Sequence, residues 1–123
     1  MNKRSPKWAR DELILALDLY FRLGAPDRWV TADDEEELIK LSQTLNQLPI
    51  HKNITNPTFR NRNGVYMKLS NFLSLDPNYS GEGLRRGGKL DKEVWDAFSE
   101  DPDKLSRLAQ SIKDSQGELT TEE

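Results

Sequence analysis

Residues 59–89 read FRNRNGVYMKLSNFLSLDPNYSGEGLRRGGK, and they join an amphipathic segment to a glycine-rich basic loop. The apolar residues of the first half recur at helical spacing: Val65, Leu69, Phe72 and Leu73. This pattern predicts a helix over residues 64–75 with Lys68 and Asn71 pointing outward. The pair Asp76-Pro77 should end the helix, because the residue before a proline avoids the α region.

The rest of the chain shows the same periodicity. Apolar stripes predict further helices over residues 8–22, 33–48 and 91–98, and Pro102 should open a last one. No segment alternates β-branched and polar residues as a strand would. We therefore expect an all-α fold: a single compact domain of about five helices with a Gly-rich basic loop, spanning residues 1–115. Residues 116–123 are expected to form a flexible acidic tail or linker.

Composition excludes several classes of protein. The chain has 123 residues, no cysteine and one histidine. Disulfides, iron–sulfur clusters and cysteine-built zinc sites are therefore excluded. No apolar run approaches the roughly 20 residues that a membrane span needs. We expect a cytoplasmic domain that does not bind a membrane, a cofactor or a metal.

The formal net charge of −3 conceals a strong segregation of charge along the chain. Residues 1–10 carry four bases and no acid, and residues 51–89 carry seven bases against two acids. Residues 11–50 and 90–123 each have six more acids than bases. A positive face on a negative body is typical of a protein that binds nucleic acid in one place.

The glycine-rich loop matches half of a nucleotide-binding motif. Gly83 to Lys89 fits the Gly-x4-Gly-Lys part of a P-loop, but Leu90 stands where Ser or Thr would hold magnesium. NTP binding is therefore not expected. The glycines would let backbone N–H groups approach phosphates, while Arg85 and Arg86 neutralise them. The alternative is a solvated turn without function.

One histidine, one loop tyrosine and two tryptophans stand out as single residues. His51 is the one histidine, and without partners it favours a polar DNA contact or plain exposure over catalysis or metal binding. Tyr79 lies in a polar loop off every apolar stripe, so its ring could stack on a ligand or cover the third helix. Trp8 and Trp95 fall on apolar faces, which predicts core positions.

A family resemblance runs through roughly residues 8–112. It is carried by these segments in order: Trp8-Ala-Arg-Asp-Glu-Leu-Ile-Leu-Ala-Leu-Asp-Leu-Tyr20, Leu48-Pro-Ile-His51, Phe59-Arg-Asn61, Asn63-Gly-Val65, Met67-Lys-Leu-Ser-Asn-Phe72, Leu75-Asp-Pro77, Tyr79, Gly81 and Gly87-Gly-Lys-Leu-Asp-Lys-Glu-Val-Trp95. Together they resemble the sulfur-binding domain of McrA-type restriction endonucleases. Members of that family read DNA whose backbone carries phosphorothioate, and they usually precede a separate HNH nuclease domain.

The resemblance implies a sulfur pocket and a set of DNA contacts. The pocket would be built from a Tyr-Pro pair and a small residue nearby, here Tyr79, Ser80, Gly81 and Gly83, with Ser80 in place of the proline. The family's His-Arg pair would map to His51-Lys52. With the basic and amide residues above, the expected DNA-binding set is His51, Lys52, Arg60, Arg62, Asn63, Lys68, Asn71, Arg85, Arg86, Gly88 and Lys89.

The sequence thus predicts a non-catalytic reader of phosphorothioate-modified double-stranded DNA, part of a modification-dependent restriction system and fused to or acting with an HNH nuclease. Three alternatives remain open. The chain could read unmodified or otherwise modified DNA, it could be a small nuclease that uses His51, or it could be a helical module that binds another protein.

Overall fold

The computed structural model describes residues 7–48, 59–79 and 88–121, with side chains described as far as residue 115. Its elements are α1 (Arg10–Arg22), the short 3₁₀ helix η1 (Ala32–Asp34), α2 (Glu35–Gln47), α3 (Arg62–Leu75), α4 (Lys89–Phe98) and α5 (Pro102–Thr121). No strand occurs in these ranges. The predicted all-α fold with five α-helices in one domain is therefore confirmed.

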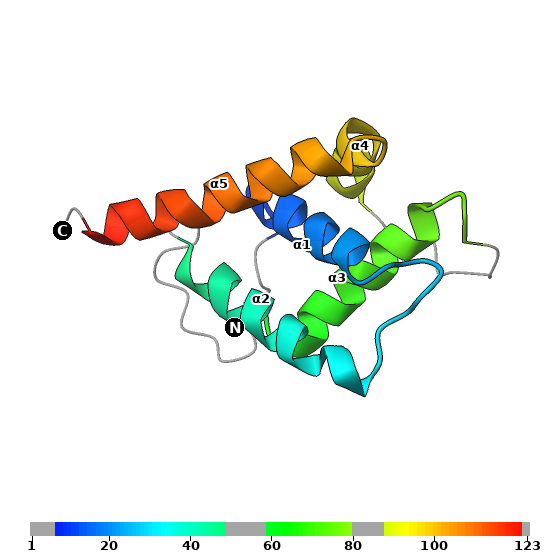
Figure 1. Cartoon of the computed structure of the whole chain (residues 1–123), viewed down its shortest axis with the longest axis horizontal. Helices are drawn as coiled ribbons and strands as arrows, with labels where there is room; N and C mark the ends of the chain where they lie inside the picture. The colour runs from blue at the N-terminus through cyan, green and yellow to red at the C-terminus, as the bar shows by residue number, and fades with distance from the viewer. Residues whose placement is uncertain (1–6, 49–58, 80–87, 122–123) are drawn as a thin grey trace, which may run out of the picture.

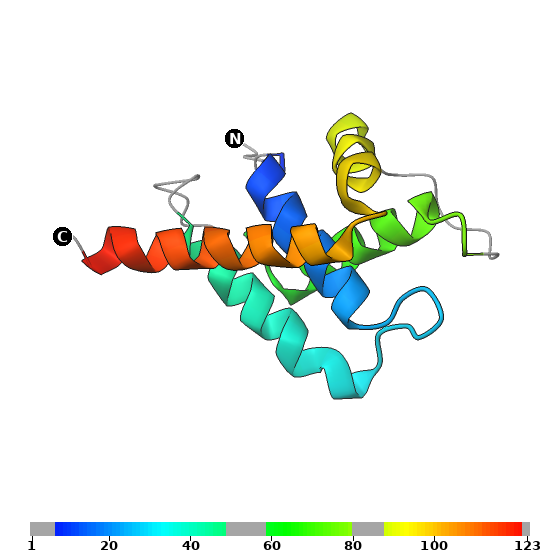
Figure 2. The same cartoon turned by 45° about the horizontal axis from the view of Figure 1, so that its top comes forward.

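Helix α1 is the centre of the fold and contacts each of the other four α-helices. It lies between the long helix α5 on one side and the pair α2 and α3 on the other, with α4 near one end of α5 (Figures 1 and 2). Its run Leu13–Leu17 is at most 1% exposed, and Leu19 and Tyr20 are fully buried. A helix that is buried on nearly every side is typical of the interior of a bundle.

An aromatic cluster joins three helices in this core. The Trp95 ring of α4 lies 5.8 Å from that of Tyr20, 5.7 Å from that of Phe21 and 6.4 Å from that of Phe72. Trp95 is 8% exposed, as expected for a core residue, whereas Trp8 is only partly buried. The difference arises because Trp8 precedes the first helical residue, so helical periodicity does not fix its direction.

The helix ends follow local chemistry. Helix α1 ends before Gly24, whose φ of +89° is a conformation that glycine adopts without strain. Before α2, the Thr31 hydroxyl caps η1 by accepting a hydrogen bond from the Asp33 N–H (3.2 Å). Helix α3 begins at Arg62, two residues before the predicted start, because the Asn61 side chain caps the Gly64 N–H at 2.8 Å.

Helix α5 is longer than the sequence indicated. Residues 116–121 were expected in a flexible tail, yet they continue the helix to Thr121. Extending an existing helix costs little, because each added residue gains one backbone hydrogen bond without a new nucleation step. A polar composition can therefore remain helical without an apolar face.

Candidate nucleic-acid interface

A basic groove lies where the residues before α1 meet α3 and the first turn of α4. It has a volume of about 450 Å³ and is lined by Lys7, Trp8, Lys68, Gly88, Lys89, Leu90, Asp91 and Glu93. We call it the α4 groove. Lys68, Gly88 and Lys89 were predicted to bind DNA, and the fold brings them together. Lys7 and Trp8 were absent from the predicted set, although the basic N-terminal block already pointed to Lys7.

Asp91 organises one wall of the α4 groove. Its carboxylate accepts hydrogen bonds from Lys68 Nζ at 3.1 and 3.2 Å, from the Asn71 amide at 3.4 Å and from the Gly88 N–H at 3.2 Å. Asp91 is 4% exposed and the Lys68 side chain 14%. Lys68 and Asn71, which were predicted to point outward, are half-buried, because a buried carboxylate on α4 faces both of them.

Besides the paired Lys68 and Asp91, the α4 groove is lined by one acid, Glu93, and by two lysines, Lys7 and Lys89. Both lysines are exposed, and neither has an ion pair among the described residues. Lys89 is the first residue of α4, whose N-terminal end adds a partial positive charge of its own. Two lysines and a helix N-terminus thus point their positive charge at the same space.

Trp8 is held in the groove by cations on neighbouring segments. The Arg60 guanidinium lies 4.9 Å from the centre of the Trp8 ring, and Lys68 Nζ lies 5.3 Å from it. Arg60 also packs 4.4 Å from the Phe59 ring. Cation–π contacts of this kind fix the ring's position while leaving Trp8 half-buried.

Arg60 is structural. Its side chain is 2% exposed and pairs with the fully buried Glu12, through Nε to Oε2 at 2.8 Å and Nη2 to Oε1 at 3.0 Å. The Arg60 Nη2 also donates to the Lys7 carbonyl at 3.2 Å, while Glu12 accepts from the Ala9 N–H at 2.8 Å. This burial disagrees with the expectation of a DNA-facing Arg60. The pair instead ties residues 7–9 to the rest of the domain.

Arg62 and Asn63 lie at the start of α3 and do not line the groove. Arg62 donates to the Glu35 carboxylate through Nη2 at 2.7 Å and through Nε, which links α3 to α2. These hydrogen bonds lower the pKa of Glu35 below its ordinary value and raise the pKa of Arg62. Asn63 is exposed. Arg62 is therefore already engaged with a carboxylate, whereas Asn63 faces solvent.

Tyr79 is the one member of the predicted sulfur pocket that the structure describes, and it is half-buried. Its N–H donates to the Asp76 carbonyl at 3.1 Å. The Asp76 carboxylate is anchored in turn by the Tyr20 hydroxyl and the Asn78 N–H, each at 2.8 Å. The other predicted site residues outside the described ranges are His51, Lys52, Ser80, Gly81, Gly83, Arg85 and Arg86.

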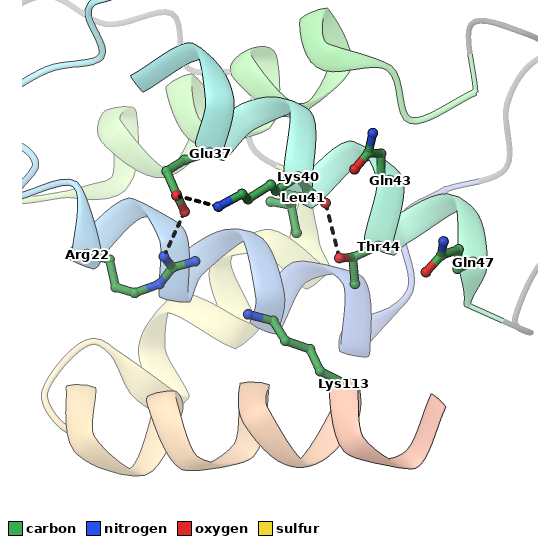
Figure 3. A pocket seen from close by; sticks show the side chains of 8 residues that line it. All are labelled: Arg22, Glu37, Lys40, Leu41, Gln43, Thr44, Gln47 and Lys113. Carbon is green, nitrogen blue, oxygen red and sulfur yellow. Dashed lines mark hydrogen bonds and ion pairs between the residues drawn. The ribbon is translucent and has the colours of Figure 1, made fainter. Parts of the chain in front are cut away.

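A second groove lies between α2 and α5, above the last turns of α1 (Figure 3). Lys113 extends into it from α5, as Figure 3 shows, and Arg22 faces it from α1. Glu37 lies between its cations, 3.2 Å from Arg22 Nη1 and 3.8 Å from Lys40 Nζ. Arg22 and Lys40 are thus paired with Glu37, whereas Lys113 has no ion pair among the described residues.

Metal chemistry and membrane insertion find no support in the described residues. Across 7–48, 59–79 and 88–121, no three His, Cys, Asp or Glu side chains are grouped so as to hold a metal ion. In the same ranges, no helix combines the length and apolarity needed to cross a membrane.

Comparison with known proteins gives no match to a family model, to a curated protein or to a solved structure. The residues of this chain, together with the resemblance stated for its sequence, are therefore the basis for a proposed function.

Proposed function

We propose that this chain is a non-catalytic module that binds double-stranded DNA through the α4 groove and reads a phosphorothioate in the backbone. The observation that carries the proposal is the convergence of exposed Lys7 and Lys89 with the N-terminus of α4. Lysines and helix N-termini are both common phosphate ligands. Their combination in one groove suits a DNA backbone better than an uncharged ligand.

The positions of further basic residues along the sequence support the α4 groove as the DNA-binding surface. Lys3 and Arg4 precede Lys7 by four and three residues, and Arg85 and Arg86 precede Gly88 by three and two. Lys7 and Gly88, the first described residues after these two basic pairs, both line the α4 groove. Lys68, although paired with Asp91, adds a third ammonium group to its wall. A concentration of positive charge at one place favours a polyanion.

Selection of sulfur is the finer part of the proposal and rests on the resemblance. Sulfur is larger, softer and more weakly hydrated than the phosphate oxygen that it replaces, so an apolar cup can prefer it. Tyr79 would supply the aromatic edge of such a cup, with Ser80, Gly81 and Gly83 as its small members. Ser80 makes this cup more polar than a proline would, which favours a second candidate function, the binding of DNA irrespective of modification.

Binding of duplex DNA is tested by its salt dependence. The affinity should fall steeply between about 50 and 200 mM salt, because each lysine that contacts a phosphate releases counterions. Lys7→Gln combined with Lys89→Gln should reduce the slope of log K against log salt by about two, or one per lost phosphate contact. Fluorescence anisotropy with a labelled duplex measures both effects.

The matched control for this pair is Lys104→Gln combined with Arg107→Gln. Both residues are exposed on α5, and the double change removes the same net charge. It should leave the slope unchanged within error. Equal loss in both double variants, or an affinity insensitive to salt, would contradict binding at the α4 groove.

Sulfur reading is tested with two duplexes that differ in a single phosphorothioate. The wild-type chain should bind the modified duplex more tightly, and Tyr79→Ala should reduce that preference by about 1–3 kcal/mol, the size of one aromatic contact to a nucleotide. Ser80→Pro should increase the preference, because it returns an apolar ring to the cup. Equal affinity of the wild type for both duplexes would establish the second candidate, a reader of unmodified DNA.

A further inference from the structure

A third groove, opposite in charge to the α4 groove, lies between the end of α1, the turn after α3 and the last turn of α4. It has a volume of about 340 Å³ and is lined by Phe21, Asp76, Pro77, Asn78, Trp95, Asp96, Ser99 and Glu100. Three of these residues are acids and none is basic. We call it the acidic groove. Nothing in the proposed DNA function uses it.

One wall of the acidic groove carries a buried carboxylate without a counter-charge. Asp76 is 6% exposed, and it accepts hydrogen bonds from the neutral Tyr20 hydroxyl and Asn78 N–H. No Lys or Arg among the described residues forms an ion pair with it. Burial raises the pKa of Tyr20, and the Asp76 carboxylate beside its hydroxyl raises it further. A carboxylate that is buried without a cation favours the approach of one.

Aromatic rings and a helix end add to the preference of the acidic groove for a cation. The Phe21 and Trp95 rings lie 5.7 Å apart and line the groove together. The groove also includes Ser99, the residue that caps the C-terminal end of α4, where the helix carries a partial negative charge. Aromatic faces and helix C-termini both attract cations.

Asp96, on the rim of the acidic groove, can exchange its ion-pair partner. Asp96 pairs with Lys92 at 2.8 Å, but both side chains are more than half exposed, at 58% and 66%. An exposed pair of this kind contributes little stability, so an incoming cation can replace Lys92 at low cost. Glu100 is exposed and has no ion pair among the described residues.

We propose that the acidic groove binds the guanidinium group of an arginine on a partner polypeptide. A guanidinium is planar, so it can lie against an aromatic ring while its N–H groups contact carboxylates, which an ammonium group does less well. The volume is near the lower end of the roughly 300–1,000 Å³ found for ligand pockets, which suits one long side chain. The acidic rim complements further basic residues around that arginine, as charges across protein interfaces do.

The test uses the full chain and a blocked peptide, Gly-Arg-Arg-Gly, titrated while ¹H–¹⁵N spectra are recorded. The peptide should shift the Trp95 indole N–H and the backbone amides of Ser99 and Glu100. The lysine counterpart, Gly-Lys-Lys-Gly, should bind at least about threefold more weakly, because it lacks the planar fork. Equal affinity for the two peptides, or no shift at these three positions, would overturn the proposal.

Two pairs of substitutions distinguish binding in the acidic groove from general attraction between opposite charges. Asp96→Asn combined with Glu100→Gln should weaken the arginine peptide by at least about tenfold, since both rim charges are lost. The control, Asp11→Asn combined with Asp33→Asn, removes the same charge from exposed positions outside the groove and should retain the affinity. Equal weakening by both pairs would refute a specific site. The Lys7→Gln and Lys89→Gln pair should bind the peptide normally, so failure of the DNA proposal would not imply failure here.

Discussion

Glu12→Gln should lower the free energy of unfolding by about 3–5 kcal/mol, the cost of leaving a buried charge without its partner. Glu12 is fully buried, and its carboxylate receives two hydrogen bonds from Arg60, at 2.8 and 3.0 Å. The glutamine side chain keeps the shape and one oxygen but loses the charge. The Arg60 guanidinium would remain buried and charged, because a guanidinium is not deprotonated in proteins.

Urea unfolding measures this effect, and Asp11→Asn is the matched control. Asp11 is the exposed neighbour of Glu12 in the same helical turn, so its change should stay within about 0.5 kcal/mol. Replacing both partners, as Glu12→Leu with Arg60→Met, should cost less than Glu12→Gln alone, because no unpaired charge remains. A loss under about 1 kcal/mol for Glu12→Gln would show that the pair does not stabilise the fold.

The same pair has a consequence for the proposed interface. Arg60 donates to the Lys7 carbonyl and Glu12 accepts from the Ala9 N–H, so the ion pair holds the segment that carries Lys7 and Trp8. Arg60 therefore supports DNA binding in this proposal indirectly, by holding Lys7 in the α4 groove. A basic residue in a basic sequence block need not be a surface contact.

The charge of residues 51–89 overstates the positive surface of the domain for this reason. Three of its bases, Arg60, Arg62 and Lys68, pair with Glu12, Glu35 and Asp91 respectively. These partners are 23 to 48 residues away in the sequence, as the hydrogen bonds record. No local pattern in a single sequence relates positions so far apart. Segregation of charge points to a region of the sequence, but only the fold distinguishes the cations held in ion pairs from those without one among the described residues.

The helices themselves were predictable because their signals are local. The stripe of α3, with Val65, Leu69 and Phe72 all fully buried, lies where the 3.6-residue period placed it. The Asp76-Pro77 pair ends α3 as expected, and Gly24 follows the end of α1, since backbone preference decides such positions. Trp8, which was predicted to be a core residue, is only partly buried against the core. The helical period does not apply to it, because Trp8 precedes Ala9, whose backbone is extended rather than helical.

Trp95→Ala should be the most damaging change in the aromatic core, lowering the free energy of unfolding by about 3–5 kcal/mol, as large truncations of buried aromatic residues do. Trp95 is the ring through which α4 contacts Tyr20 and Phe21 of α1 and Phe72 of α3. Removing it would leave a cavity that three helices share, and the surrounding chain can close such a cavity only in part. Thermal and urea unfolding followed by circular dichroism measure the loss.

Trp95→Phe separates the loss of packing from the loss of an aromatic contact. Phenylalanine keeps a ring at the same place and removes less volume. Trp95→Phe should therefore lose less than half of the stability that Trp95→Ala loses. Lys92→Ala, at an exposed position of the same helix, should cost no more than about 0.5 kcal/mol. If Trp95→Ala were as mild as Lys92→Ala, α4 would not depend on this ring for docking. In that case the first turn of α4, with Gly88 and Lys89, would have to be held at the proposed DNA site by the Lys68 to Asp91 pair instead.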